Sequence, residues 1–386
     1  MRGVQSPSAT GPCAVTIVAH DVGSVGGMER QLAELVSGLR GLGHDVTVIA
    51  RTCELPAELG VRFHRVRGPR RPFLLFYPWF ALVGSLTVWR RRRGVVQATG
   101  AIVCNRVDSV AIHCCHQVYR ATPTRSTLPY RWYVALNGLV KRTAERLCMR
   151  TNVTASIVCV SEGVAQEMRT HYPHAAARVL TIHNGVDTDV FAPGMHKREA
   201  RALRAKLGIG DQRLVAAFVA REWGHKGLAA VIEALSLAPD WDLVVGGTGD
   251  EVRYRRLADS NGVGEAVHWL GLTREIEVVY ELASALVLPS SYETFSLVAF
   301  EAAASGVPVL ATPVSGVREL IRDGENGFLI EAEPRSIAER LNRLAGDPAL
   351  RARMGSSARD SALAFTWDDA VAKHHELYES IARSRA

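Results

Sequence analysis

This 386-residue sequence lacks an excess of charge: Asp, Glu, Lys and Arg make up 22%, slightly below the usual fraction of about 25%, whereas hydrophobic residues make up 47%. This much apolar surface to bury argues against a disordered chain, a coiled coil and a fibre. The chain is long for one compact core. At about 150 residues per domain, it predicts two globular domains.

Cysteine is also sparse and unevenly placed. The seven cysteines, an odd number, all lie in the first half and have no spacing typical of a secreted disulfide framework. The first apolar run, AVTIVA at residues 14–19, is far too short for the core of a signal peptide. We therefore expect reduced thiols, a cytoplasmic location and no glycosylation at Asn152.

Acidic residues are few in the first half of the chain. Residues 1–190 contain 23 basic and 12 acidic side chains, a net charge of +11, whereas residues 191–386 contain 23 and 27, a net charge of −4. The first half is expected to meet an anionic ligand or surface, with a solvated basic face as the alternative. No nucleic-acid motif accompanies the charge, so nucleic acid is not an expected partner.

One apolar stretch approaches the length of a membrane span. Residues 72–89, PFLLFYPWFALVGSLTVW, have arginines at both ends and are interrupted by Pro78, Gly84 and Ser85. The interruptions, and the lack of a second such segment, favour a helix packed in the first domain. An amphipathic element that also touches a membrane surface is one alternative, and a true span is the other.

Short apolar runs alternate with helical patterns along most of the chain. AVTIVA is followed by a glycine-containing turn, by leucines at helical spacing and by a second strand at residues 45–50. The same alternation resumes after a polar linker that ends near residue 199, with strands such as LVAAFVA and ALVLPS. Continuous apolar strands between helices predict parallel sheets covered on both faces, and hence two doubly wound α/β domains facing each other across a cleft.

The predicted organisation has four parts. Residues 1–12, rich in Ser, Gly and Pro, are expected to be disordered. The first α/β domain spans residues 13–190 and the second spans residues 191–365. Residues 366–386 are expected to form a helix that packs back on the first domain.

The strongest chemical signal lies between residues 290 and 330. Glu293 and Glu301 come after a predicted strand, and a helix is expected to start between them. The loop after a parallel strand lies at the carboxyl edge of the sheet, where ligands bind, so we expect Glu293 there. Glu301 falls in a mostly apolar helix, where a buried carboxylate needs a hydrogen-bond donor such as a ligand hydroxyl.

Several motifs in a consistent order resemble one protein family. GGMERQLAELVSGLRGLGHDVTVIA, IHNGVDTDVF, VAREWGHKGLAAVIEAL, LVVGGTGD, residues 290–330 and the terminal TWDDAVAKHHELY look like the successive landmarks of retaining glycosyltransferase family 4. The resemblance covers most of the chain. It implies the GT-B architecture of two facing Rossmann-like domains. It also implies a nucleoside-diphosphate sugar as the donor substrate, with no separate cofactor and no metal.

The resemblance implies roles for residues of the second domain. Glu301 would hold the ribose hydroxyls of the nucleotide sugar, and Glu293 would contact hydroxyls of the transferred sugar. The backbone N–H groups of Phe295, Ser296 and Leu297 would face the sugar or the diphosphate. Many family members have glycine at the position of Ser296. The Ser296 side chain would occupy space that glycine leaves open to the donor.

Arg221 and Lys226 are the expected partners of the diphosphate. They lie five residues apart, after a predicted strand. A leaving nucleoside diphosphate gains negative charge as the glycosidic bond breaks, so cations at this place stabilise the transition state more than the ground state. Gly247, in LVVGGTGD, is expected in a loop near the nucleotide.

The first domain offers two further candidates. Gly26 and Gly27 do not form a G-x-G-x-x-G fingerprint. The resemblance implies that they let the backbone approach the donor diphosphate or the acceptor, with a simple turn as the alternative. His116, or His113 as the fallback, would lie beside the sugar at the end of a strand. Their cysteine neighbours alternate in direction along a strand, so no metal site is expected.

These patterns predict a retaining, metal-independent glycosyltransferase that moves a sugar from a nucleotide donor to an acceptor hydroxyl. The acceptor could be a lipid, a glycan or a small natural product. A peripheral contact with the inner membrane face, through the basic first domain, is a further expectation. The alternatives are an inactive protein that binds nucleotide sugars and an NAD-dependent oxidoreductase.

Overall fold

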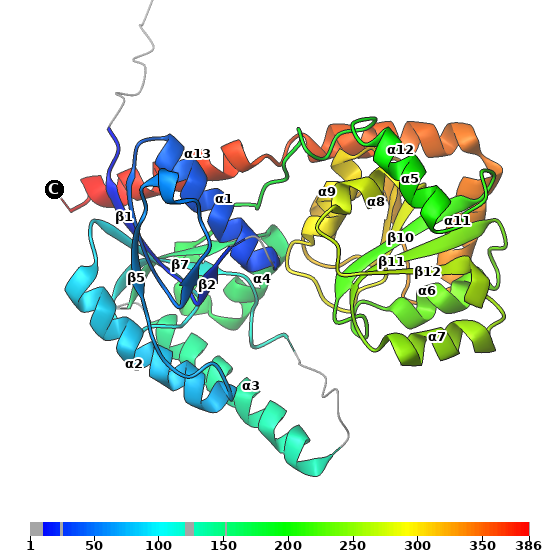
Figure 1. Ribbon diagram of the computed structural model, residues 1–386. Helices are drawn as coiled ribbons and strands as arrows, with labels where there is room; N and C mark the ends of the chain where they lie inside the picture. The colour runs from blue at the N-terminus through cyan, green and yellow to red at the C-terminus, as the bar shows by residue number, and fades with distance from the viewer. Residues whose placement is uncertain (1–10, 24–25, 120–126, 151–152, 386) are drawn as a thin grey trace, which may run out of the picture. The chain divides into compact units, whose positions relative to one another are not determined.

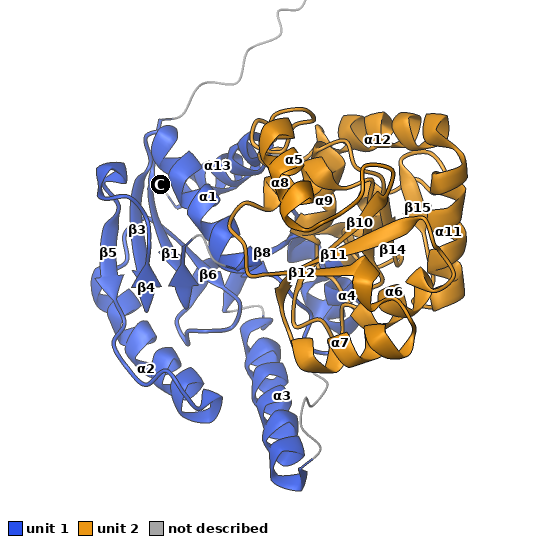
Figure 2. Ribbon diagram, turned by 45° about the vertical axis from the view of Figure 1, so that its right-hand side comes forward, with its two compact units in different colours: residues 1–160, 164–182, 367–386 blue, residues 161–163, 183–366 orange. Residues whose placement is uncertain are grey.

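A computed structural model describes residues 11–23, 26–119, 127–150 and 153–385. The chain folds into two compact units (Figure 2). Unit 1 comprises residues 1–160, 164–182 and 367–386, and unit 2 comprises residues 161–163 and 183–366. Each unit contains a parallel sheet with helices packed on it, which confirms the predicted pair of doubly wound α/β domains.

Unit 1 is built on a seven-stranded sheet in the order β5-β3-β1-β6-β7-β8-β9. All neighbouring strands run parallel. The strands are β1 (Ala14–Val18), β3 (Asp45–Ala50), β5 (Arg62–Arg65), β6 (Val95–Thr99), β7 (Val107–Ile112), β8 (Thr154–Cys159) and β9 (Val179–Thr181). A separate short pair joins β2 (Asp21–Val22) to β4 (Thr52–Cys53). The central strands are buried almost throughout, which explains their continuous apolar runs.

The helices of unit 1 include the last one of the chain. They are α1 (Gly27–Gly41), α2 (Phe73–Arg91), α3 (Leu128–Cys148), α4 (Glu162–His171) and α13 (Trp367–Arg383). Helix α13 packs closely on α1 (Figure 1), because a Cβ at Gly38 would lie only 2.4 Å from Val371 Cγ2. Val371 and Tyr378 of α13 belong to the same apolar core as the leucines of α1.

Unit 2 is built on a six-stranded parallel sheet in the order β12-β11-β10-β13-β14-β15. Its strands are β10 (Leu214–Arg221), β11 (Trp241–Thr248), β12 (Val267–Gly271), β13 (Ala285–Leu288), β14 (Val309–Ala311) and β15 (Gly327–Leu329). Its helices are α5 (Lys197–Lys206), α6 (Leu228–Leu235), α7 (Glu251–Ser260), α8 (Ile276–Leu282), α9 (Leu297–Ala304), α10 (Val317–Leu320), α11 (Pro334–Gly346) and α12 (Pro348–Ala362). Helices α6 and α11 pack together on one side of the sheet, and α5, α8 and α9 lie on the other (Figure 1).

The apolar segment at residues 72–89 forms helix α2. By length and composition this helix could cross a membrane, yet only 17% of its most apolar 18-residue window is buried. Phe80, Gly84 and Val88 are its buried residues. One side of the helix therefore packs on unit 1, and five large apolar side chains on the other side are exposed.

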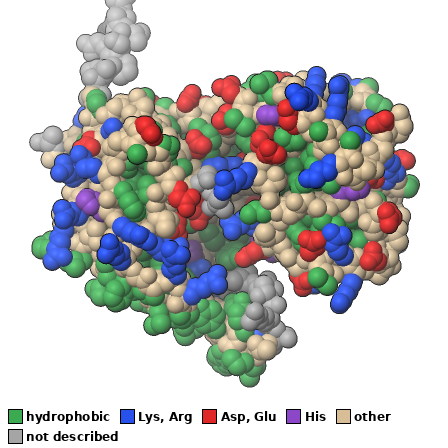
Figure 3. All heavy atoms as spheres, viewed as in Figure 1, with side chains coloured by type: hydrophobic (Ala, Val, Ile, Leu, Met, Phe, Trp, Pro, Cys, Tyr) green, Lys and Arg blue, Asp and Glu red, His purple; other side chains and the backbone are tan. Residues whose placement is uncertain are grey.

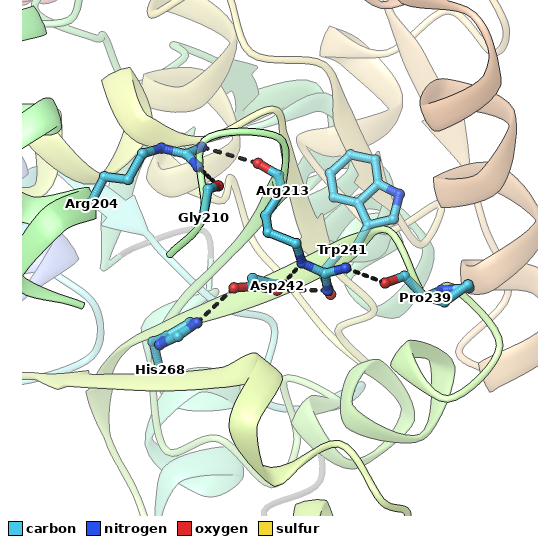
Figure 4. A network of polar contacts seen from close by, with 7 residues as sticks. All are labelled: Arg204, Gly210, Arg213, Pro239, Trp241, Asp242 and His268. Carbon is cyan, nitrogen blue, oxygen red and sulfur yellow. Dashed lines mark hydrogen bonds and ion pairs between the residues drawn. The ribbon is translucent and has the colours of Figure 1, made fainter. Parts of the chain in front are cut away.

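A buried polar network lies at the amino-terminal edge of the unit 2 sheet (Figure 4). Asp242, the second residue of β11, accepts hydrogen bonds from Arg213 Nε at 2.7 Å and from His268 Nε2 at 2.9 Å. Arg213 also donates to the carbonyl oxygens of Pro239 and Trp241. Because ligands bind at the opposite, carboxyl edge of such sheets, this network belongs to the fold.

The network makes stability depend on pH. Burial raises the pKa of Asp242, but the hydrogen bonds from His268 and Arg213 outweigh burial and hold the pKa below its usual value. A carboxyl group whose pKa is lower in the folded state stabilises the protein above the unfolded pKa of about 3.9. This stabilisation is lost as the pH falls through the folded pKa.

We expect Asp242→Asn to lower the free energy of unfolding at pH 7 by about 2–3 kcal/mol, because two donors lose their charged acceptor. Urea denaturation measures this difference, which should shrink once the pH falls below about 4. Glu325→Gln is the control, since the Arg322–Glu325 ion pair is exposed and should contribute less than about 0.5 kcal/mol. A loss that is the same at pH 7 and pH 3.5, or no larger than that of the control, would contradict the assignment.

Candidate functional site

An ion pair joins two loops at the carboxyl edge of the unit 2 sheet. Lys226 follows β10, and Glu293 follows β13. Lys226 Nζ lies 2.6 Å from Glu293 Oε1, and both side chains are largely buried. The same carboxylate oxygen accepts a hydrogen bond from Ser290 Oγ at 2.8 Å. Two of the residues expected from the sequence are thus in direct contact, and Ser290 is a partner that the sequence did not single out.

Backbone contacts hold the two loops together. The His225 carbonyl accepts hydrogen bonds from Ser291 N at 3.0 Å and from Ser291 Oγ at 3.1 Å. Gly227 has a φ of 83°, and a Cβ there would lie 2.5 Å from the Pro289 carbonyl oxygen. Glycine is therefore required where the loop after β10 passes the loop after β13. These contacts fix the backbone that carries Lys226 and Glu293.

Glu301 is a buried carboxylate in α9, with 2% of its surface exposed. Its Oε2 accepts a hydrogen bond from the hydroxyl of Tyr280, a buried residue of α8, at 3.2 Å. Tyr280 lies 21 residues earlier in the chain, so no local sequence pattern could have indicated it. Glu301 lies one helical turn into α9.

The loop between the two glutamates has an unusual backbone. Ser296 is the N-cap of α9 and has φ 72° and ψ 65°, in the left-handed region. The Phe295 side chain stacks on Phe300, with 4.0 Å between ring centroids, so only its backbone can face a ligand. Leu297 is the first residue of α9. The N–H groups of a helix's first turn point away from the helix, which is the geometry that an anion needs.

Strain is concentrated at this edge of the sheet. Within the described part of the chain, Ser296 and Glu222 are the non-glycine residues with positive φ, and Glu222 follows β10 directly. Each such residue costs about 1–2 kcal/mol relative to the right-handed conformation. Strained residues of this kind cluster at functional sites. The left-handed conformation also explains why glycine suits the position of Ser296.

Arg221 and Lys226 occupy different environments. Arg221 is the last residue of β10 and is exposed. Among the described residues, no hydrogen bond or ion pair engages its guanidinium group, whereas Lys226 is paired with Glu293. The two cations therefore lie at the same sheet edge, one held in place and one free to meet an incoming anion.

Gly247 lies inside a strand instead of in a loop. Strand β11 extends to Thr248, so the loop begins later than the sequence pattern suggested. A Cβ at Gly247 would lie 1.8 Å from the Ala220 carbonyl oxygen, and its φ is 103°. Glycine is needed at this position for close packing against β10.

A second polar cluster was not expected from the sequence. Glu319 of α10 accepts a hydrogen bond from Gly316 N at 3.3 Å and a short one from His183 Nε2, in the linker motif IHNGVD. Burial raises the pKa of Glu319, but the hydrogen bonds from His183 and from backbone N–H groups hold the pKa below its usual value. The two partners lie in the sequence motifs SGVRE, which contains Glu319, and IHNG, which contains His183.

In unit 1, the two glycines lie at the start of α1, the helix that follows β2. Gly26 is the N-cap of α1, with φ 106°, and Gly27 is the first residue of the helix. The Gly26 carbonyl accepts the first hydrogen bond of the helix, from Arg30 N at 3.0 Å. A φ of 106° is accessible to glycine at little cost, so this position requires it.

The two candidate histidines of unit 1 differ in their partners. His116 Nδ1 lies 2.9 Å from Glu145 Oε2, and the buried Glu145 also accepts a hydrogen bond from the Tyr172 hydroxyl. His113 lies directly after β7, and its buried Nε2 has no hydrogen-bond partner in the described chain. Burial lowers the pKa of His113 to about 4, so this imidazole is neutral at pH 7.

The described residues contain no group of three or more His, Cys, Asp or Glu side chains placed to hold a metal ion. The side chains at the unit 2 edge offer cations and hydrogen-bond donors to an anion, and carboxylates to hydroxyl groups. That combination suits a ligand with both phosphates and sugars.

Family models match both halves of the chain. The model "Glycosyltransferase Family 4" matches residues 25–190, and the model "Glycosyl transferases group 1" matches residues 199–361. The boundary between the two matches lies near the end of the linker that carries IHNGVD.

Curated relatives include proteins named D-inositol 3-phosphate glycosyltransferase. The one from Corynebacterium aurimucosum is 33% identical over 261 residues, which is 63% of this chain and 61% of that protein. The one from Streptomyces bingchenggensis is 32% identical over 244 residues, 59% of this chain and 53% of that protein. The chain thus aligns with between half and two thirds of the length of these relatives.

Solved structures share the fold over nearly the whole chain. WaaG, a glycosyltransferase involved in lipopolysaccharide biosynthesis, has a TM-score of 0.76 and 21% identity, covering 94% of this chain and 98% of its own. Anabaena Alr3699/HepE in complex with UDP-glucose has a TM-score of 0.71 and 20% identity, covering 96% and 99%. The two family matches, the relatives and the shared architecture agree with the resemblance noted in the sequence. The chain belongs to glycosyltransferase family 4 and has the GT-B fold of two Rossmann-like domains.

Proposed function

We propose that the protein transfers a sugar from a nucleoside diphosphate to an acceptor hydroxyl, with retention of configuration and without a metal. The observation that carries this proposal is the Lys226–Glu293 ion pair at the carboxyl edge of the unit 2 sheet, the edge at which the exposed Arg221 ends β10. It places fixed positive charge and a carboxylate at one sheet edge, where a sugar diphosphate needs both. The bound UDP and UDP-glucose of the HepE structures support a donor of this class.

The ion pair prepares Lys226 for a diphosphate. An ammonium group has three donors, and the bond to Glu293 uses one of them. The remaining donors, with the Arg221 guanidinium, would meet the charge that develops as the donor bond breaks. Because Glu293 already orients the lysine, little reorganisation is needed when the leaving group forms.

The carboxylates would hold the sugars. Glu293 Oε1 accepts from Lys226 and Ser290, which leaves Oε2 for a hydroxyl of the transferred sugar. Glu301 would accept from the ribose hydroxyls, and Tyr280 would keep its carboxylate in place. The acceptor hydroxyl would attack from the face that the diphosphate leaves, and a phosphate oxygen would take its proton. No side-chain nucleophile is required in this mechanism.

We further propose an anionic acceptor. Unit 1 contains most of the basic first half of the chain, and a polyanionic acceptor would be drawn to it. Relatives named for D-inositol 3-phosphate make that compound the first acceptor to test. Anionic glycans and lipid phosphates are the next candidates.

Glu301→Ala tests the donor site. UDP, GDP, ADP or dTDP should stabilise the native protein by about 2.7 kcal/mol at a hundredfold excess over Kd, measured as a rise in the unfolding midpoint. The variant should lose this rise for whichever nucleotide binds, because the ribose loses its carboxylate partner. Tyr280→Phe is the matched control, because it removes the hydrogen bond that Tyr280 donates to Glu301 but keeps the carboxylate. This variant should be less stable than the wild type and should retain the nucleotide-dependent rise in the unfolding midpoint. Full retention of the rise in Glu301→Ala would refute the ribose assignment.

The variants Arg221→Gln and Lys226→Met distinguish an effect on catalysis from an effect on stability. Each should lower kcat by about 10²–10³, since each removes a charge that stabilises the leaving group. Arg221 is exposed, so its variant should unfold like the wild type. Lys226→Met should also destabilise the protein, because the buried Glu293 loses its partner, and adding Glu293→Gln should restore stability without restoring activity. A kcat equal to that of the wild type in Arg221→Gln and Lys226→Met would show that neither cation acts in catalysis.

An inactive nucleotide-sugar-binding protein is the second candidate, since it would share the donor site. Release of free nucleoside diphosphate distinguishes the two. A binder without activity would show the thermal shift but release none with any donor or acceptor. The oxidoreductase alternative is not pursued, because the chain belongs to the glycosyltransferases.

A further inference from the structure

The outer side of α2 carries an apolar stripe. Five large apolar side chains are exposed at alternating spacings of four and three residues: Leu75, Trp79, Leu82, Leu86 and Trp89. At 100° per residue, this spacing keeps them on one side of the helix. The buried Phe80, Gly84 and Val88 lie on the opposite side, against the rest of unit 1.

Helix α3 carries a second stripe. Its exposed apolar residues near the amino-terminal end are Leu128, Trp132, Leu136 and Leu139. The start of α2 contacts this helix, because Phe73 N donates to the Tyr133 hydroxyl at 2.9 Å and Lys141 Nζ lies 5.0 Å from the Phe73 ring centroid. We call these nine exposed residues of α2 and α3 the apolar surface. Figure 3 shows hydrophobic side chains gathered at the lower edge of unit 1, where Figure 1 places both helices.

Positive charge surrounds the apolar surface. Residues 62–150 contain 17 basic and 2 acidic side chains. Both acids are buried and engaged: Asp108 pairs with Arg385, and Glu145 pairs with His116. Exposed arginines flank α2 at residues 70–71 and 90–93. Lys and Arg side chains border the hydrophobic ones in Figure 3.

We propose that the apolar surface docks unit 1 on an anionic lipid bilayer, with α2 and α3 lying in the interface. Apolar stripes, tryptophans and flanking arginines are the features of helices that bind in this way. Each arginine near an anionic membrane contributes about a fivefold gain in affinity, and six exposed arginines lie at the two ends of α2. The proposal concerns unit 1 alone and does not depend on the donor site.

The other occupants of this surface fit less well. A second copy of the chain would bring the same excess of positive charge, so the two surfaces would repel each other. A membrane-spanning α2 would have to withdraw Phe80 and Val88 from the core of unit 1, where both are almost fully buried. A bilayer surface satisfies the apolar stripes and the arginines together.

Vesicle flotation of the full-length protein tests the proposal. We expect binding to vesicles that contain about one third phosphatidylglycerol to exceed binding to pure phosphatidylcholine by about tenfold or more, and to weaken at high salt. Leu82→Glu with Trp89→Glu should lower the affinity for anionic vesicles by at least about tenfold, because it places two charges in the interface. The matched control is Leu272→Glu with Val252→Glu in unit 2, and it should bind like the wild type. Leu82 and Leu272 are similarly exposed, at 70% and 66%.

Two further measurements keep the result interpretable. Circular dichroism checks folding. Replacing the four exposed arginines Arg90–Arg93 by glutamine provides a second variant, which should also weaken binding. No flotation of the wild type, or equal flotation of the apolar variant and its control, would overturn the proposal. Self-association that the apolar variant abolishes, without vesicle binding, would assign the surface to a second copy instead.

Discussion

The ion pair between Lys226 and Glu293 is the contact on which the account of the site depends. It joins the loops after β10 and β13, and it leaves a lysine positioned at a sheet edge before any ligand arrives. A buried pair of this kind costs desolvation energy, and a core of apolar residues would serve stability at least as well. Its presence is therefore better explained by a ligand that needs a fixed cation and a carboxylate at one place.

The surroundings of the pair are consistent with a site built for such a ligand. Gly227 lets the two loops approach each other, and Ser296 and Glu222 hold strained backbone conformations. Glu301 is buried with Tyr280 as a partner. Strain and buried polar groups reduce stability, and the apolar cores beneath the sheets offset that cost.

The sequence predicted most of the fold, because continuous apolar strands and helical spacing depend on local residue order. Helix α9 begins at Leu297, as the motif indicated, and α2 covers the expected apolar segment. Partners brought together by tertiary packing could not be predicted: Tyr280 on Glu301 and His183 on Glu319. The sequence could not predict that α2 is exposed either, because an apolar helix has the same composition whether it is buried or exposed.

The central claim is that Lys226 and Arg221 bind the diphosphate, and the affinity of a nucleoside diphosphate relative to its nucleoside tests it most directly. Calorimetric titration should show the diphosphate binding at least about a hundredfold more tightly than the nucleoside, since charge-assisted hydrogen bonds contribute about 1.5–3 kcal/mol each. In Lys226→Met this ratio should collapse while the affinity for the nucleoside stays the same. An unchanged ratio would contradict the account.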